Sequence, residues 1–239
     1  VGYGLRGLSH PRKRKKRRNN PNERGRDKMK IFSNKFEDFV LDMVTDIRTD
    51  ALNPRRTVVI NMDTINGFFK HGNMYSPRLK EIIPKIVQVN EYFVHSEKIF
   101  FADKHTEESV EFATYPPHCM DGDESEVIEE LRFFSERSNS VTIEKNSTNA
   151  FFVGEFMAWL RENIKTVENF VIVGGATDIC VMQFALSLKA YFDQLNRQKN
   201  VAVVENAVQT FDSEGHDGDK MHIFAIYNMI MNGVSVYSI

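Results

Sequence analysis

NFVIVGGATDICVMQFALSL, residues 169–188, joins a nearly all-apolar run to a segment in which apolar residues recur at helical spacing. The first part, residues 169–175, suits a strand that is buried on both faces of a sheet. The small residues that follow predict a tight turn from strand to helix. Cys180, one of two cysteines in the chain, lies at the start of the predicted helix.

The same alternation of strand and helix runs through the rest of the chain. Further β-branched, apolar segments predict strands at 57–62, 98–103, 140–145, 200–206 and 234–239. Segments with helical spacing lie near 34–51, 77–94, 124–136, 150–164, 178–196 and 215–232. Strands alternating with helices predict the α/β class, with a three-layer, doubly wound sandwich around a mostly parallel six-stranded sheet.

Length and charge favour a single domain behind a basic leader. Residues 1–28 hold eleven Lys or Arg against two acids, whereas the remainder holds twenty against thirty-one. We interpret 1–28 as a disordered leader, which includes the possibility of a stretch ahead of a natural start at Met29, and 29–239 as one domain. A nucleic-acid-binding module or a catalytically silent scaffold is the competing class, but an acidic body would repel phosphate.

Hydropathy and cysteine content indicate the compartment in which the protein works. Apolar stretches are interrupted well before the roughly 20 residues that span a bilayer, so we expect no membrane segment. The two cysteines, Cys119 and Cys180, could in principle form one bridge, but a chain of 239 residues can bury enough surface to fold without one. These features favour a cytoplasmic protein.

Chemically capable residues follow the predicted strands where such sheets bind ligands, beyond their carboxyl ends. Asp63 follows the first strand, Asp103 and His105 follow the second, Lys145 closes the third and Cys180 comes shortly after the fourth. At a helix start, unpaired N–H groups and the helix dipole favour a thiolate at Cys180. Asp63 could serve as its base, and Lys145 could hold that carboxylate. Each residue alone has an ordinary structural explanation, so their joint arrival at one edge carries the prediction.

Residues 102–119, ADKHTEESVEFATYPPHC, predict a metal site. Asp103, His105 and His118 supply oxygen and nitrogen ligands that suit zinc, iron or manganese, with too few thiolates for a closed structural zinc site. Glu111 is a possible fourth ligand, directly or through water, or simply a surface acid.

The motifs VVINMDTINGF, DKH followed by PPHC, EKNSTNAFF and GGATDICV together resemble the isochorismatase-like cysteine hydrolases, and within them the nicotinamidase/pyrazinamidase branch. The resemblance runs from about Thr57 to Ile239. It implies a catalytic triad of Asp63, Lys145 and Cys180, and a divalent metal ion, zinc before iron or manganese, on Asp103, His105 and His118, with Glu111 as a variable additional ligand. It also implies a cis bond between Gly175 and Ala176, an oxyanion hole of the Ala176 and Cys180 amides, and substrate contacts from Phe68 and Tyr115.

The activity implied by the resemblance is hydrolysis of nicotinamide to nicotinate and ammonia through a thioester on Cys180. Asp63 would take the thiol proton, Lys145 would steady the charges, and a water near the metal would hydrolyse the acyl-enzyme. The partner expected is therefore a small carboxamide, neither nucleic acid nor membrane, and the resemblance implies a homo-oligomer.

Three positions depart from the pattern of many nicotinamidases. Ile65 replaces a Gln, Gly67 replaces an Asp, and Lys104 stands where an aromatic residue is common. Because these positions surround the pocket and metal rather than the nucleophile, they bear on substrate choice. The alternative within the fold is a cysteine hydrolase that acts on another small carboxamide or a ureido compound, with the Asp103 cluster only structural.

Overall fold

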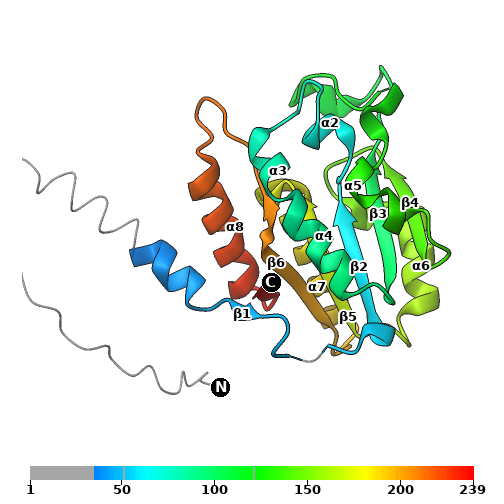
Figure 1. Ribbon diagram of the computed structural model, residues 1–239, viewed down its shortest axis with the longest axis vertical. Coiled ribbons are helices and arrows are strands. Elements are labelled where there is room, and N and C mark those ends of the chain that lie inside the picture. Colours follow the sequence, from blue (N-terminus) through cyan, green and yellow to red (C-terminus); the bar gives the residue numbers. More distant parts are fainter. Residues whose placement is uncertain (1–34, 51, 121) are drawn as a thin grey trace, which may run out of the picture. The chain divides into compact units, whose positions relative to one another are not determined.

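The computed structural model describes residues 35–50, 52–120 and 122–239. Within them a parallel sheet of seven strands has the order β1-β7-β6-β5-β2-β3-β4 (Figure 1). The strands are β1 (Thr45–Asp46), β2 (Thr57–Met62), β3 (Glu97–Asp103), β4 (Ser140–Lys145), β5 (Asn169–Gly175), β6 (Asn200–Gln209) and β7 (Ser235–Ser238). The predicted leader, residues 1–28, lies outside the described residues.

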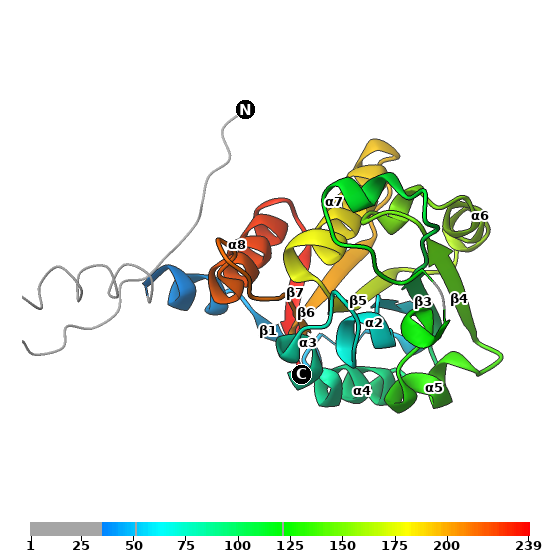
Figure 2. The ribbon, with the colours of Figure 1, turned by 90° about the horizontal axis from the view of Figure 1, so that it is seen from above.

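Helices cover both faces of the sheet, as a doubly wound fold requires (Figure 2). One face carries α3 (Pro77–Glu81), α4 (Ile83–Tyr92) and α5 (Glu129–Ser135), and the other carries α6 (Gly154–Asn163), α7 (Met182–Gln194) and α8 (Gly218–Met231). A short helix, α2 (Asn66–Phe69), follows β2, and a π-helical turn, Thr177–Val181, precedes α7. Single 3₁₀ turns lie at Pro54–Arg56, Val110–Ala113, Gly122–Ser125 and Ala150–Phe152.

Two hydrophobic cores fill the spaces between sheet and helices. Phe170 and Ile172 of β5 meet Phe184 and Leu188 of α7 in one core, while Val171 of the same strand belongs to the core under α3, α4 and α5. Every residue of β2 and β5 is buried, which explains why neither strand alternates polar with apolar residues. The elements from β1 to β7 belong to the compact unit Val40–Ile239.

The expected α/β fold is confirmed, with one correction to the strand count. The sheet has seven strands rather than six, because β1 pairs beside β7 through only two polar residues and leaves no apolar pattern. The helix expected over 34–51 is helical in the described residues only at 35–41. The helix expected over 77–94 is divided, since Pro77 and Pro84 each stand in a first helical turn and proline cannot continue a preceding helix.

A close approach of β2 and β5 positions the functional edge of the sheet. Met62 pairs with Gly174, whose φ is +114°, and a Cβ at Gly174 would overlap the carbonyl oxygen of Met62. Only glycine fits there. The chain segments that leave the two strands, which carry Asp63 and Cys180, therefore begin side by side.

No helix in the described part of the chain is long and apolar enough to cross a membrane.

Candidate active site

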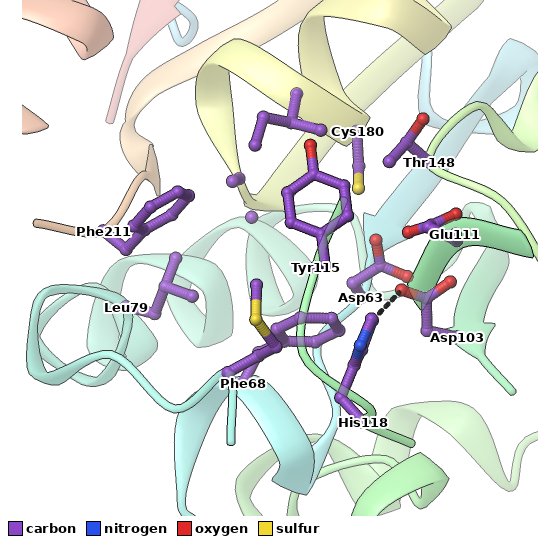
Figure 3. A pocket seen from close by; sticks show the side chains of 14 residues that line it. Asp63, Phe68, Leu79, Asp103, Glu111, Tyr115, His118, Thr148, Cys180 and Phe211 are labelled. Atoms are coloured by element: carbon purple, nitrogen blue, oxygen red, sulfur yellow. Dashed lines mark ion pairs between the residues drawn. The ribbon is translucent and has the colours of Figure 1, made fainter. Parts of the chain in front are cut away.

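A cavity opens at the carboxyl ends of the central strands (Figure 3). The residues that line it include Asp63 after β2, Asp103 at the end of β3, and Cys180 in the π-helical turn after β5. Four further residues singled out in the sequence also line it: Phe68, Glu111, Tyr115 and His118. The cavity lining thus contains two of the three predicted triad residues and three of the four predicted metal ligands.

Lys145 joins the groups of this cavity. Its Nζ lies 2.5 Å from Asp103 Oδ1, 3.0 Å from Asp63 Oδ2 and 3.9 Å from Cys180 Sγ. The lysine side chain is fully buried, and both carboxylate side chains are 2% exposed. Burial opposes the charge of the lysine, but the two carboxylates outweigh it and hold the pKa of Lys145 well above its usual value.

Asp63 has the environment of a general base. Burial raises the pKa of its carboxyl to about 7; the Lys145 charge opposes this rise and the Asp103 charge adds to it. A pKa near neutrality lets the same carboxyl accept and return a proton at working pH. Its backbone has a φ of +52°, which is unusual for a residue other than glycine, and its N–H donates to the Phe101 carbonyl at 3.0 Å.

The Cys180 thiol differs from the sequence expectation. Burial raises its pKa well above the usual value, and the favourable charge of Lys145 does not offset that burial. This direction is opposite to the one expected for a cysteine at a helix start, because Cys180 lies inside the π-helical turn, 7% exposed and beside two carboxylates. A thiol with a raised pKa needs a base at the moment of attack.

The turn before Cys180 contains the cis peptide bond expected between Gly175 and Ala176. The carbonyl of Ala176 accepts hydrogen bonds from the N–H groups of Ile179 and Val181, at 3.2 and 3.1 Å. These two hydrogen bonds close the turn that contains Cys180. Ala176 and Cys180 both line the cavity, as an oxyanion hole built from their amides requires.

Asp103, His105, Glu111 and His118 form a group that could hold a metal ion. One candidate ligand atom from each lies within 4.8 Å of the others. The Nε2 atoms of His105 and His118 face Asp103 Oδ2 at 3.6 and 3.5 Å, and Figure 3 marks the second of these contacts. The two oxygens of Asp103 therefore have different neighbours: Oδ1 contacts Lys145, and Oδ2 contacts the imidazoles.

The donor set fits a divalent cation. His105 donates from Nδ1 to the side-chain oxygen of Asn146 at 2.7 Å, and His118 donates from Nδ1 to the carbonyl of Pro116 at 2.8 Å. Both Nε2 atoms are thereby left with a lone pair directed at the group. His105 Nε2 is buried and has no hydrogen-bond partner in the described part of the protein, as expected for an atom that binds an ion. Two imidazoles and two carboxylates suit zinc, iron or manganese.

Comparison with known proteins identifies the family of this chain. Residues 57–233 match the isochorismatase domain. The chain belongs to the isochorismatase family. It is similar to Nicotinamidase 1 of Arabidopsis thaliana, with 28% identity over 211 residues, covering 75% of this chain and 84% of the relative.

Solved members of the isochorismatase fold superimpose on most of the chain. A pyrazinamidase of Pyrococcus horikoshii in complex with zinc matches with a TM-score of 0.62 and 22% identity, covering 77% of this chain and 99% of that protein. An N-carbamoylsarcosine amidase of Thermoplasma acidophilum matches with a TM-score of 0.60 and 25% identity, covering 77% and 96%.

The structure explains how this isochorismatase-family chain accommodates its departures from the nicotinamidase pattern. A side chain at Gly67 would begin 2.7 Å from Cys119 Sγ, so an aspartate does not fit there. Ile65 is buried against Ala102 and the cavity-lining residue Phe68. Lys104 points to solvent and pairs with Glu144 at 2.6 Å, away from the metal group.

Several cavity residues were missed by sequence reasoning. Met74, Leu79, Thr148, Ile179 and Phe211 line the cavity beside the predicted residues. Most are apolar residues on loops or short helices, and such residues carry no pattern that separates them from core residues. Asn146 was also missed, although it directly follows Lys145 in EKNSTNAFF and its amide signals a partner for a ligating imidazole.

Proposed function

We propose that this chain is a metal-dependent cysteine amidohydrolase that converts nicotinamide to nicotinate and ammonia. The observation that carries the proposal is the position of Lys145 Nζ, in contact with Asp63, Asp103 and the Cys180 sulfur in one buried cluster. The similarity to Nicotinamidase 1 of Arabidopsis thaliana supports nicotinamide as the substrate.

In the proposed mechanism Asp63 takes the Sγ proton as Cys180 attacks the carboxamide carbon. The amides of Ala176 and Cys180 hold the oxyanion, and Lys145 balances the negative charges around the sulfur. Asp63 then gives its proton to the departing nitrogen, ammonia leaves, and a thioester remains on Cys180. A water that Asp63 deprotonates then attacks the thioester and the C–S bond breaks. Asp63 returns the proton to the sulfur, which leaves the acid product and the free thiol.

Asp103, His105 and His118 would hold the divalent ion, with Glu111 as a fourth ligand. When bound, the ion supplies a Lewis acid at the edge of the cavity. Phe68 and Tyr115 stand on the cavity wall, where aromatic rings can flank a pyridine ring. Zinc is our first choice because the zinc-bound pyrazinamidase of Pyrococcus horikoshii shares the fold.

Ammonia release from nicotinamide tests the proposal directly. We expect release by the metal-loaded protein, loss of release in Cys180→Ala with unchanged thermal unfolding, and loss after chelation that zinc restores. No release by the wild-type protein, or full release by Cys180→Ala, would contradict the proposal. Sedimentation of the same preparation tests the predicted homo-oligomer.

A second candidate, hydrolysis of a ureido compound, is favoured by the 25% identity with the N-carbamoylsarcosine amidase of Thermoplasma acidophilum. A panel that contains nicotinamide, pyrazinamide and N-carbamoyl amino acids, scored for ammonia, separates the two candidates. Faster turnover of the ureido compounds would replace nicotinamide as the proposed substrate while leaving the triad in place.

A further inference from the structure

One wall of the active-site cavity is shared with a second hollow in the surface. Met74, Tyr115 and Phe211 line both spaces. Beyond them the outer hollow is lined by residues that include Arg78, Asp212 and His216. In the view of Figure 3, Phe211 stands on the side of the cavity away from Asp103 and His118. The position of the Phe211 ring therefore sets the limit of the cavity on that side.

His216 holds the Phe211 ring in place. The two rings stack nearly parallel, with an interplanar angle of 7° and centroids 4.2 Å apart. Nδ1 of His216 lies 2.9 Å from the carbonyl oxygen of Phe211, so the imidazole contacts both the ring and the backbone of the same residue. The backbone of His216 also exchanges hydrogen bonds with Ser213, at 3.0 and 3.1 Å, which closes the loop between them.

The other ring nitrogen of His216 joins this loop to the turn that carries the nucleophile. Nε2 lies 2.8 Å from Asp178 Oδ2, and Thr210 donates its hydroxyl to Asp178 Oδ1 at 2.6 Å. Asp178 lies within the π-helical turn, two residues before Cys180. Both side chains of the pair are mostly buried, at 20% and 12% exposed, so solvent screens their contact less than that of a surface pair.

We propose that His216 is a positioning residue for the active site. It fixes Phe211 as a wall of the cavity and, through Asp178, ties that wall to the turn of Cys180. The wall limits how wide a molecule can lie next to the sulfur, and so favours flat carboxamides over bulky ones. The consequence for substrate choice depends on the proposed amidohydrolase function, whereas the structural role of His216 does not.

Alkylation of Cys180 by two reagents of different size tests this role without any need for hydrolysis. The rate with N-ethylmaleimide, divided by the rate with the smaller iodoacetamide, reports the width of the cavity. Both reagents react with the thiolate, so a change in the thiolate fraction of Cys180 affects the two rates equally and cancels. Peptide mass analysis separates Cys180 from the buried Cys119. We expect the ratio to rise about fivefold in His216→Ala, the rate equivalent of one aromatic stacking contact.

Matched variants identify the route through which His216 acts. Phe211→Ala should raise the ratio at least as much, and the double variant should show no further rise because both changes release the same wall. His216→Gln, which keeps a donor for Asp178 but has no ring, should raise the ratio in the same direction and serves if the alanine variant does not fold. His71→Ala is the control, since His71 also pairs with an aspartate, Asp123, but lines neither space.

An unchanged ratio of the two alkylation rates in folded His216→Ala or His216→Gln would overturn the proposal. A ratio in the His216→Ala/Phe211→Ala double variant that rises by the product of the two single effects would also overturn it. For the hydrolysis of nicotinamide, the same variants should raise KM with little change in kcat. If the wild-type protein hydrolyses no amide, the proposed function fails, and the alkylation ratio still decides the role of His216.

Discussion

Replacing Lys145 by Met tests how the buried charge cluster is balanced. The change keeps the length of the side chain but leaves Asp63 and Asp103, each 1% exposed, without their cation. Breaking a buried ion pair by removing one partner costs about 3–5 kcal/mol. We therefore expect the free energy of unfolding of the metal-free protein at pH 8 to fall by that amount.

The loss should depend on pH in a definite direction. In the wild type, burial raises the pKa of Asp103 but the Lys145 charge and the hydrogen bonds outweigh it, so that the pKa lies below its usual range. Its stabilising contribution is present above the unfolded pKa of 3.8 and is lost only as pH falls through the lower folded value. Without the Lys145 charge, only the contacts with His105 and His118 still oppose burial, so we expect the folded pKa of Asp103 to rise. The variant should then bind more protons on folding than the wild type does, so that its deficit shrinks as pH falls toward 4.

Urea unfolding of wild type and Lys145→Met in chelator, at pH 8 and pH 5, measures both effects. Lys145→Arg is the matched control, because it keeps the charge and tests whether the fit of the ammonium matters. A deficit under about 1 kcal/mol at pH 8, the range of an exposed ion pair, would refute the reasoning. A deficit that grows on going to pH 5 would refute it as well.

Three further predictions concern the base, the strand crossing and the metal group. Because Asp63 must be ionised to accept the thiol proton and its pKa is about 7, kcat/KM should rise with pH through about 7; Asp63→Asn should remove this rise together with the activity, and a pH-independent profile in the wild type would contradict the assignment. Gly174→Ala should lower the free energy of unfolding by roughly 2 kcal/mol or more, because its φ is +114° and the new Cβ would overlap the Met62 carbonyl. Gly154→Ala is the control, since no atom lies within 4 Å of the added Cβ and stability should not fall. Urea unfolding measures both variants. Asn146→Ala should weaken zinc binding about 10–100-fold in calorimetry by releasing the imidazole of His105, and unchanged affinity would show that the amide does not orient the ligand.

The sequence predicts the central parts of the fold because burial imposes a pattern there. The strands at 57–62 and 169–175 are found with the expected bounds, since continuous apolar runs fit a sheet covered on both faces. The edge strand at 140–145 also has the expected bounds, although most of its residues are exposed or only partly buried. β1 was missed because its two residues are polar, and Thr45 is exposed while Asp46 is only partly buried. Such an edge strand is defined by its partner, β7, and leaves no mark on its own sequence.

The candidate site shows the same division. Asp63 and Lys145 were predictable because they end or follow strands, and parallel strands deliver their ends to one edge. The raised pKa of the Cys180 thiol was not predictable. A helix start predicts a lowered pKa, and only the three-dimensional structure shows how deeply the sulfur is buried. Phe211 and His216 lie five residues apart on a loop, where no periodicity signals that their rings stack.

The Asp103 carboxylate links two parts of the cavity: Oδ1 contacts the ammonium of Lys145, which lies beside the Cys180 sulfur, and Oδ2 contacts the two imidazoles. A substitution of Asp103 that removes the metal ligand would also remove the carboxylate that lies nearest to the ammonium of Lys145. We therefore expect relatives without a metal ion to keep the aspartate and to differ at the two histidines. Substitution of the aspartate itself should affect both metal binding and the reactivity of Cys180.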